Sequence, residues 1–428
     1  VFKSGANQGF RRFSLPDTTK LGVSSVSDMS LFLPFEGAIN RTAVVILRKG
    51  KTTNYPVPYK LWLPDQPRTI VEANDLATVR KRMQILAWLA TPVEPSHPES
   101  PWLTAPKNVL SDLQKVVGDQ RDAIIQRSYA GSCTWLNGVY WADEISSSAK
   151  GVIIRNRGDC GRKKVRTIES SIESSVLFPL LRGRDLKAWC AEPSGLIIVP
   201  HRPDDFAAPI SVGDMKQKYP RAYDYFLQFE KDLKKRSGYK QLHKSRKEFY
   251  VMGNVGNYTL EPYKVAFKDL TEFFQCAVVR PHLIDGKREA PVVPDHTVLF
   301  LNGRNPDEAY FFAGVLNSIP SRVALYCQSV GVQTQRYFTV DIARVRALQF
   351  SAHDAVHKRI ADLSKKCHDL ACSGKHPETL LSMELELAER CAELWGIGKN
   401  ALKAILDAYQ LIDSFRTAEV AEAEDDDE

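Results

Sequence analysis

The N-terminal part of the chain divides into short stretches that space their apolar and polar positions differently. Residues 42–47 form an apolar, β-branched run that ends at the basic residues 48–51, a pattern typical of a buried strand in a larger sheet. Residues 55–64 hold several prolines and are interpreted as an extended connector. Residues 73–91 have helical spacing, whereas residues 92–106 hold five prolines and are interpreted as a linker.

The middle of the chain mixes the two periodicities. Asn137-Gly138 indicates a hairpin turn. Residues 219–236 place Tyr223, Phe226 and Leu233 on one side of an amphipathic helix that starts near a proline and ends in cations. A second helix is expected over residues 307–317. Apolar runs predict three strands, at residues 152–154, 196–199 and 298–301.

In the C-terminal part the apolar residues recur at helical spacing, and the chain ends in a run of acidic residues. Helices are expected over residues 353–372, 377–395 and 401–411. The segment from Glu419 to Glu428 carries seven acids and no base, which is typical of a disordered tail. Together these patterns predict a mixed α/β (α+β) fold that ends in a helical segment.

Charge and composition narrow the class of protein. The formal net charge is +7, and it becomes about +14 when the acidic tail is set aside, which suits a polyanionic partner such as nucleic acid. No apolar run is long enough to cross a bilayer, so no membrane partner is expected. The start at Val1 has no signal-peptide pattern and resembles a cut from a longer chain, and a cytoplasmic protein is expected.

The eight cysteines argue against a metal site. They are scattered and form no CxxC pair, so no structural zinc site is expected. In a large chain without a secretory signal, reduced thiols are the expectation. Cys367, His368 and Cys372 fall in a helical pattern and are interpreted as packing residues.

Several stretches together resemble N6-adenine DNA methyltransferases of the type IIG and related restriction–modification kind. Residues 5–13 (GANQGFRRF) and 34–45 (PFEGAINRTAVV) look like the last motifs of that family's catalytic domain. Residues 178–189 (FPLLRGRDLKAW) resemble a signature inside its target-recognition domain, and this is the most specific stretch. Residues 219–236 and 311–318 (FFAGVLNS) look like later elements of that domain.

The resemblance implies a division into five parts. Residues 1–64 would be the terminal strands of the methyltransferase sheet, and residues 65–106 a helix with a proline-rich linker. Residues 107–350 would form the mixed α+β target-recognition domain, residues 351–417 C-terminal helices, and residues 418–428 an acidic disordered tail. The implied function is recognition of a DNA site, so that an adenine in duplex DNA is positioned for methyl transfer in a restriction–modification or phage-defence system.

Two motifs of that family are absent from the sequence. It contains no Asn/Asp-Pro-Pro-aromatic tetrapeptide, which holds the target adenine, and no glycine-rich turn after a strand, which binds S-adenosylmethionine. The glycines of residues 253–256 are interpreted as an ordinary turn. S-adenosylmethionine is therefore expected as the cofactor of a full enzyme but not bound by this chain alone. The chain is expected to be inactive unless a separate N-terminal catalytic half supplies these motifs.

Methylation inside a duplex requires the base to be flipped out, and an aromatic ring usually stacks on it. In the resembled family this aromatic precedes the strand that contains the RTAVV sequence. Phe35 is the candidate here, with Phe32 as the poorer match. The competing interpretation is that both rings anchor a hairpin in the core.

Cations and amides supply the candidate DNA contacts. Arg182 and Arg184 flank Gly183, which would let the backbone approach a phosphate or a guanine edge closely, and Lys187 follows them. The alternatives are a surface turn with solvated charges or an ion pair between an arginine and Asp185. Further backbone-tracking cations are expected between residues 231 and 247, unless they form a plain solvated helix face, and base-reading groups near residue 335. These further candidates are Lys234, Lys235, Arg236, Lys244, Arg246, Gln333, Gln335 and Arg336.

Other functions are less well supported by the residues. Asp204 and Asp295 each follow a proline, as in many nucleases, but neither precedes a convincing ExK strand, so no catalytic metal is expected. The main alternative is a non-catalytic DNA-binding or assembly subunit of a defence complex, which contacts partner proteins through the C-terminal helices and the acidic tail. An RNA-binding protein is disfavoured because no RNP-type or KH-type signature is present.

Overall fold

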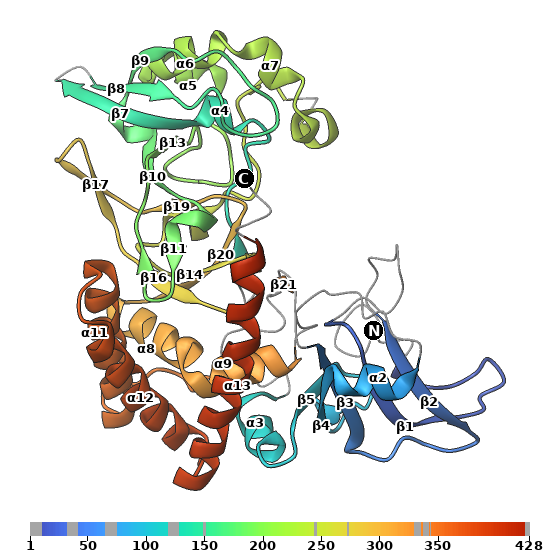
Figure 1. Ribbon diagram of the computed structural model, residues 1–428. Helices are drawn as coiled ribbons and strands as arrows, with labels where there is room; N and C mark the ends of the chain where they lie inside the picture. The colour runs from blue at the N-terminus through green and yellow to red at the C-terminus, as the bar shows by residue number, and fades with distance from the viewer. Residues whose placement is uncertain are drawn as a thin grey trace.

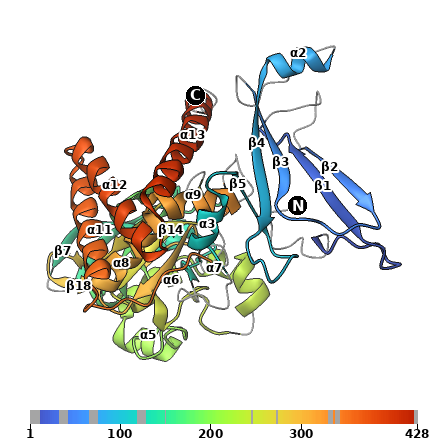
Figure 2. The same ribbon diagram turned by 90° about the horizontal axis from the view of Figure 1, so that it is seen from below.

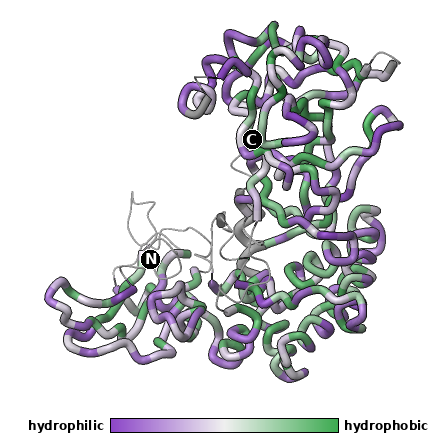
Figure 3. The backbone as a smooth tube through the Cα atoms, turned by 180° about the vertical axis from the view of Figure 1, so that it is seen from behind, coloured by the Kyte–Doolittle hydropathy of each residue, from purple (hydrophilic) through white to green (hydrophobic). Residues whose placement is uncertain are grey.

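The computed structural model describes residues 11–31, 42–64, 75–118, 128–148, 151–243, 246–271, 274–328, 335–336, 342 and 344–423. Figure 1 shows three regions: a sheet lobe (residues 11–106), an upper lobe (residues 136–260) and a base formed mainly by residues 263–423. Seen from below, the sheet lobe stands beside the helices of the base (Figure 2). Apolar residues concentrate where these elements pack, and hydrophilic residues occupy the projecting turns (Figure 3). The predicted mixed α+β class is confirmed.

The sheet lobe is one five-stranded sheet in the order β2-β1-β3-β4-β5. Only β1 and β3 run parallel, and the other neighbours are antiparallel. The strands are β1 (Leu21–Asp28), β2 (Ala43–Lys49), β3 (Val57–Pro64), β4 (Met83–Pro92) and β5 (Trp102–Pro106), with the short helix α2 (Leu76–Lys81) before β4.

The helix and linker expected over residues 65–106 are wrong within the described residues. Helix α2 is only 6 residues long, and β4 pairs with β3 along its length, from Val57↔Ala90 to Pro64↔Met83. The proline-rich stretch ends in β5, whose Trp102 is fully buried. Met, Gln, Leu and Ala favour helices in isolation, but the burial and backbone pairing offered by β3 outweigh that weak preference.

The connector expected over residues 55–64 is also wrong, because β3 is the central strand of this sheet. Its prolines are compatible with that position. Strand β1 pairs with β3 only over Tyr59, Lys60 and Leu61, so Pro58 has no ladder to complete on the β1 side.

Strand β2 is confirmed as a strand, but it is not buried. It lies at one edge of the sheet. Val44 is 50% exposed, Ile46 56% and Leu47 39%. An edge with so many exposed apolar side chains is the kind of surface that another strand or chain covers.

The upper lobe is built on a six-stranded sheet in the order β19-β10-β13-β7-β8-β9, with short helices packed against it. Its own buried cluster includes Tyr140, Phe178, Tyr225 and Phe226. The strands are β7 (Trp141–Ser148), β8 (Gly151–Asn156), β9 (Glu169–Ile172), β10 (Leu177–Leu181), β13 (Leu196–Ile198) and β19 (Val293–Pro294). The helices are α4 (Asn137–Tyr140), η3 (Ser174–Val176), η4 (Gly183–Asp185), α5 (Val212–Lys218), α6 (Pro220–Leu227), α7 (Glu230–Lys234), η5 (Tyr239–His243) and η6 (Asn257–Leu260).

Two local expectations in this lobe are wrong. Asn137-Gly138 begins the helical turn α4 instead of a hairpin, because the Asn137 side chain is hydrogen-bonded to Thr134 (Oγ1–Oδ1 2.5 Å) and Gly138 packs on Gly158. The single helix expected over residues 219–236 is two, α6 and α7, separated at Gln228–Phe229.

The base joins a four-stranded antiparallel sheet, in the order β16-β14-β20-β6, to long helices. One buried cluster runs from the sheet lobe through this sheet into the C-terminal helices, and includes Trp102, Phe311 and Ile405. The strands are β6 (Tyr129–Ala130), β14 (Tyr263–Lys268), β16 (Cys276–Val279) and β20 (Val298–Gly303). The helices are α3 (Leu110–Val116), α8 (Pro306–Asn317), α9 (Ile319–Gln328), α11 (Ala355–Ser373), α12 (Pro377–Leu394) and α13 (Lys399–Ala423).

Three small two-stranded ribbons complete the described elements. They are β11 (Leu186–Lys187) with β12 (Cys190–Ala191), β15 (Leu270–Thr271) with β21 (Gln335–Arg336), and β17 (His282–Ile284) with β18 (Arg288–Ala290).

The expected helices of the base are confirmed, with one correction at the end. The backbone of α13 is helical through Ala423, so the tail expected to be disordered from residue 418 continues a helix for several residues. Among the described residues, no helix combines the length and apolar character needed to cross a bilayer.

The expectation of reduced thiols is wrong for one pair. Cys190 on β12 and Cys372 near the end of α11 are joined by a disulfide, with their Cα atoms 5.2 Å apart. They are separated by 182 residues, so the spacing in the sequence could not indicate this pairing. The other six cysteines form no disulfide, and Cys367 is buried among packing residues as expected.

Candidate nucleic-acid interface

The turn that follows β10 is held by an ion pair inside the protein. Arg182 donates to Asp185 through Nε (3.0 Å to Oδ2) and Nη2 (3.1 Å to Oδ1), and Ser194 donates to the same carboxylate at 2.6 Å. Arg182 is only 7% exposed. Burial alone would raise the pKa of Asp185, but the hydrogen bonds from Arg182 and Ser194 outweigh it and hold the pKa below its ordinary value.

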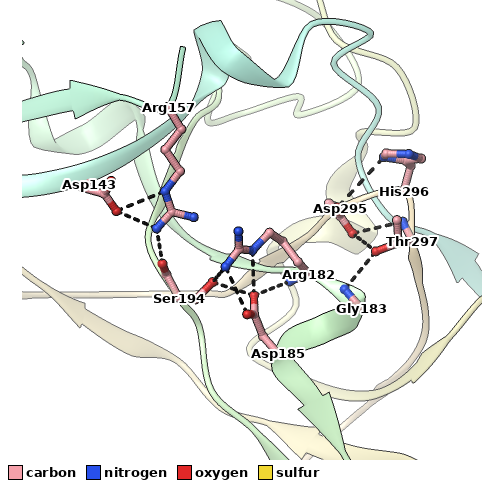
Figure 4. A network of polar contacts seen from close by, with 9 residues as sticks. All are labelled: Asp143, Arg157, Arg182, Gly183, Asp185, Ser194, Asp295, His296 and Thr297. Atoms are coloured by element: carbon pink, nitrogen blue, oxygen red, sulfur yellow. Dashed lines mark hydrogen bonds and ion pairs between the residues drawn. The ribbon is translucent and has the colours of Figure 1, made fainter. Parts of the chain in front are cut away.

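This pair belongs to a wider polar network (Figure 4). Arg157, at the end of β8, donates to Asp143 at 3.0 Å and also to the carbonyl of Ser194. On the other side, the Gly183 amide donates to Thr297 Oγ1 at 2.8 Å, and the Thr297 amide donates to Asp295 at 3.0 Å. The network therefore ties β8, the turn after β10 and the segment after β19 together.

The DNA contact predicted for Arg182 does not agree with this geometry, and neither does the role predicted for Gly183. The guanidinium fork of Arg182 already faces a carboxylate, which is one of the alternatives that the sequence left open. Gly183 is buried, and a Cβ at this position would lie 2.9 Å from Thr297 Oγ1. Its lack of a side chain serves contact within the protein. Arg184 and Lys187 are exposed at the same turn and stay candidates for contact with a phosphate.

Arg236 is the second predicted contact that turns out to be internal. It is 4% exposed, and its guanidinium donates to four backbone carbonyls. The acceptors are those of Leu233 (3.0 Å), Thr134 (2.6 Å), Phe249 (2.8 Å) and Val251 (3.0 Å). The guanidinium also lies over the ring of Tyr140, 5.3 Å from its centroid. Arg236 therefore joins three segments of the upper lobe, and four of its five N–H donors are used within the protein.

The neighbours of Arg236 point to a different surface. Lys231, Lys234, Lys235 and Lys240 are all exposed on α7 and the turns that follow it. Lys234 forms an ion pair with Glu230 at 2.7 Å, a surface pair that costs little to exchange for a phosphate.

The structure adds a cationic loop that the sequence reading missed. The connection between β8 and β9 contains the exposed residues Arg162, Lys163 and Lys164. Lys163 forms an ion pair with Asp232 on α7 at 2.7 Å. Arg166 donates to the Gln228 side chain at 3.1 Å and lies over the ring of Phe229. The loop therefore lies against α7.

Together these residues form what we call the basic surface. It consists of Arg162, Lys163, Lys164, Lys231, Lys234, Lys235 and Lys240. The run of three consecutive cations at positions 162–164 was the signal available in the sequence, but nothing in the sequence placed it beside α7.

The remaining predicted residues are only partly described. Phe35, Lys244 and Gln333 lie outside the described residues. Gln335 and Arg336 form β21, whose backbone pairs with Thr271 and Leu270 of β15. Their side chains are not described.

Arg246 is exposed and lines a polar cavity of about 460 Å³. Asp204 also lines it and forms an ion pair with Arg202 at 2.6 Å. Asp295 is 2% exposed and accepts hydrogen bonds from Thr297, so it is part of the network of Figure 4. Neither aspartate lies in a cluster of metal ligands among the described residues.

One cluster of metal-ligand type occurs in the part of the chain that the structure describes: Cys190, Glu192 and Cys372. Its two sulfurs are joined to each other, so they are not thiolate donors. The nearby His368 accepts from the Val278 amide at 2.8 Å and contacts the Ser364 carbonyl at 2.7 Å. Burial lowers the pKa of His368 to about 4, and with both ring nitrogens engaged it is a packing residue.

The chain resembles known proteins at the level of solved structures. No protein-family model and no curated protein sequence matches the chain. Among solved structures, the type IIL restriction-modification enzyme MmeI in complex with DNA is similar over 92% of this chain and 46% of its own, with 12% identity and a TM-score of 0.47. The type IIG restriction endonuclease BpuSI is similar over 92% of this chain and 45% of its own, with 11% identity and a TM-score of 0.30. The chain thus spans about half the length of the structures it matches, and likenesses this distant do not indicate a function.

Proposed function

We propose that this chain is the DNA-reading part of a site-specific adenine methyltransferase of the restriction–modification kind, acting in the cytoplasm. It holds duplex DNA so that a catalytic part bearing the Asn-Pro-Pro-aromatic motif transfers methyl from S-adenosylmethionine to adenine N6. The observation that carries the proposal is the basic surface, where the β8–β9 loop and α7 bring together cations from two separate parts of the sequence. Exposed lysines and arginines gathered in this way suit contact with a row of phosphates.

The turn after β10 supports the same function. Its network fixes the backbone, so that the exposed Arg184 and Lys187 are presented from a rigid element. A recognition module needs such rigidity because register on the duplex is set by phosphate contacts. The stretch containing this turn is also the one that most resembles the recognition domain of the family.

The exposed edge of β2 supports the need for a catalytic part. Val44 and Ile46 are half exposed on β2, which is one of the two edge strands of the five-stranded sheet. Adding a further strand or chain there would bury these side chains and satisfy the open edge. We propose that the catalytic part docks on this edge.

Binding of duplex DNA over a series of salt concentrations tests the basic surface. We compare the wild-type chain with the triple variant R162A/K163A/K164A by fluorescence anisotropy. Each lost phosphate contact should make the slope of log K against log salt less negative by about 0.9, so the variant should lose about 2 to 3 units of slope. The matched control is K365A/K366A/K375A, which removes three exposed lysines from α11 and the turn after it. Equal slopes for the variant and the control would contradict the proposal.

Methyl transfer is tested separately with labelled S-adenosylmethionine. We expect no labelling of DNA by this chain alone, and labelling when a chain that bears the Asn-Pro-Pro-aromatic motif is added. The variant V44E/I46E should abolish this complementation, because it places charge on the edge proposed to dock. Labelling by the purified chain alone would overturn this part of the proposal.

An assembly role for the C-terminal helices is the second candidate. Helix α12 exposes Leu381 (56%) and Leu385 (41%), which lie one helical turn apart. The test is sedimentation of the full chain against its L381E/L385E variant. Self-association that this variant removes, together with no affinity for duplex DNA, would favour the assembly role.

A further inference from the structure

A second group of cations lies on the sheet lobe, far along the chain from the basic surface. A cavity of about 590 Å³ opens where the chain enters β1, and the loop after β2 forms its other side. Its lining combines apolar residues with a group of cations and hydroxyls: Arg11, Arg12, Lys20, Ser14, Thr52 and Thr53. Glu99 is the one acidic residue that lines it among the residues the structure describes.

Local structure places these groups around the cavity. Residues 14 and 20 form a β-bridge, and the Leu21 amide donates to the Phe13 carbonyl at 2.8 Å, so the segment folds back on itself. Phe13 has a φ of 46°, which a bulky residue rarely adopts. Its ring is buried with its centroid 6.0 Å from that of Trp102. Packing of Phe13 therefore holds the unusual backbone, and the flanking Arg12 and Ser14 remain exposed at the cavity.

The floor of the cavity is positively charged. Arg11 is 2% exposed, and its Nε donates to the Glu99 carbonyl at 2.7 Å. Burial, followed by the nearby Arg344, lowers the pKa of Arg11, and Tyr55 and Glu99 offset this only in part. An arginine keeps its charge even so. Arg344 is paired with Glu94 (Nε–Oε1 3.3 Å) and does not line the cavity, so the charge that an anion would meet on this side is that of Arg11.

The donors are arranged for an oxyanion with several oxygens. The ammonium of Lys20 reaches Ser14 Oγ at 3.3 Å, so these two groups face the same space. Thr53 accepts from the Val23 amide at 3.0 Å, which fixes its side chain at the side of the cavity. Guanidinium, ammonium and hydroxyl donors that come from two separate loops fit a tetrahedral group better than a planar carboxylate.

We propose that this cavity is a binding site for a phosphate group, and that in the DNA complex the group is a backbone phosphate of the duplex. The second half of this statement rests on the proposed function, and the first half does not. The cavity then gives the chain a phosphate contact on the sheet lobe in addition to those on the upper lobe. The DNA would thus be held from both regions.

The test uses the full chain with two exposed cations removed. In R12A/K20A the buried Arg11 stays in place, so folding should be preserved, and equal thermal midpoints check this. The matched control K60A/K81A removes two exposed lysines that lie on the same lobe outside the cavity. Charge-preserving R12K/K20R serves as the rescue variant.

Two titrations follow, one with inorganic phosphate by calorimetry and one with duplex DNA over a salt series. We expect R12A/K20A to lose at least tenfold in phosphate affinity and about 0.9 in the salt slope for DNA, while K60A/K81A keeps the phosphate affinity and R12K/K20R keeps both. If R12A/K20A loses phosphate affinity but keeps the salt slope for DNA, the bound group is not a DNA phosphate. The cavity would then bind a free phosphate-bearing ligand. Unchanged phosphate affinity in R12A/K20A would overturn the site itself. If the wild-type chain bound no duplex, the proposed function would fail, and the phosphate titration would still decide the cavity.

Discussion

The turn after β10 and the segment from α7 to residue 247 were both selected from the sequence for their positive charge. In the structure the two regions use this charge in the same way. Each contains one buried arginine that holds backbone together, Arg182 in the first and Arg236 in the second. Each also presents exposed cations beside it, Arg184 in the turn and Lys235 in the segment. The comparison teaches that positive charge in a sequence overstates the size of an interface, because some of it is used internally.

The two buried arginines differ in how their charge is compensated. Arg182 faces the carboxylate of Asp185, whereas Arg236 faces four neutral carbonyls and the ring of Tyr140. Arginine suits both positions because its planar fork offers five donors in fixed directions. A lysine at position 236 has three donors, so at least one of the four carbonyls would lose its side-chain partner, and a lysine at position 182 could not pair with the carboxylate through a planar fork.

Replacement of Arg236 should have the largest effect on stability. In Arg236→Met four buried carbonyls lose the guanidinium donor, although that of Leu233 still accepts from the Arg236 amide, so the free energy of unfolding should fall by about 3 kcal/mol or more. Urea denaturation measures this, with Lys235→Ala as the control, which should stay within about 0.5 kcal/mol of wild type. A small loss of stability in Arg236→Met, combined with a large loss of DNA affinity, would contradict the internal role and show that Arg236 contacts DNA.

Replacement of Arg182 should have the next largest effect. Arg182→Ala leaves the Asp185 carboxylate largely buried without its cation, which should cost about 2–4 kcal/mol. Because the folded pKa of Asp185 lies below its ordinary 3.8, the pair stabilises the fold near neutral pH, and this contribution is lost as the pH falls below that value. A double-mutant cycle with Asp185→Ala should give a coupling of about 1 kcal/mol or more. Additive losses would contradict the pairing.

Lys264 differs from the two buried arginines, because it is a buried cation whose side chain can lose its proton. It is fully buried on β14, and burial lowers its pKa from 10.5 to about 7. The unfolded chain therefore binds more protons than the folded chain between pH 7 and 10.5, so stability should rise with pH across that window.

The variant Lys264→Met should remove this dependence and be more stable than wild type by about 1–2 kcal/mol at pH 7. Urea midpoints at several pH values between 7 and 10 measure both effects. Parallel pH profiles for the two proteins would show that Lys264 is not the source of the dependence.

Replacement of the exposed cations in the turn after β10 should have the smallest effect on stability. Arg184→Ala and Lys187→Ala should change the free energy of unfolding by less than about 0.5 kcal/mol. Each should nevertheless make the salt slope of DNA binding less negative by about 0.9. Lys358→Ala, an exposed lysine on α11, is the control and should leave the slope unchanged. If the salt slopes of both variants equal that of the control, the turn after β10 does not contact DNA.

Sequence patterns predicted elements best where burial agreed with local preference. The strands near residues 153, 197 and 300 and the helices α8, α11 and α12 have strong periodicity, and all of them are present. Prediction failed at β3, β4 and β5, where prolines or helix-favouring residues occur in strands that distant partners complete. It failed again at α4, where a side-chain contact from Thr134 converts a hairpin signal into a helical turn.

The candidate site was predicted less completely than the fold. Charge alone identified Arg184, Lys187 and the lysines near residue 235, all of which are exposed. It also selected Arg182 and Arg236, since a sequence does not show whether a guanidinium meets a phosphate or a carbonyl of its own chain. The sequence did not identify the loop at residues 162–164, because this loop joins the basic surface only through its contact with α7.

By itself the sequence determined the mixed α+β class, the helices α8, α11, α12 and α13 of the base, the excess of positive charge and the resemblance to a recognition module. These follow from composition, periodicity and short motifs, which are local properties of the chain. Only the tertiary structure decided which cations are available to a partner, which cysteines are joined, and that β2 lies at the edge of its sheet with exposed apolar side chains. Those outcomes depend on burial and on contacts between residues far apart in the chain, and no local pattern encodes them.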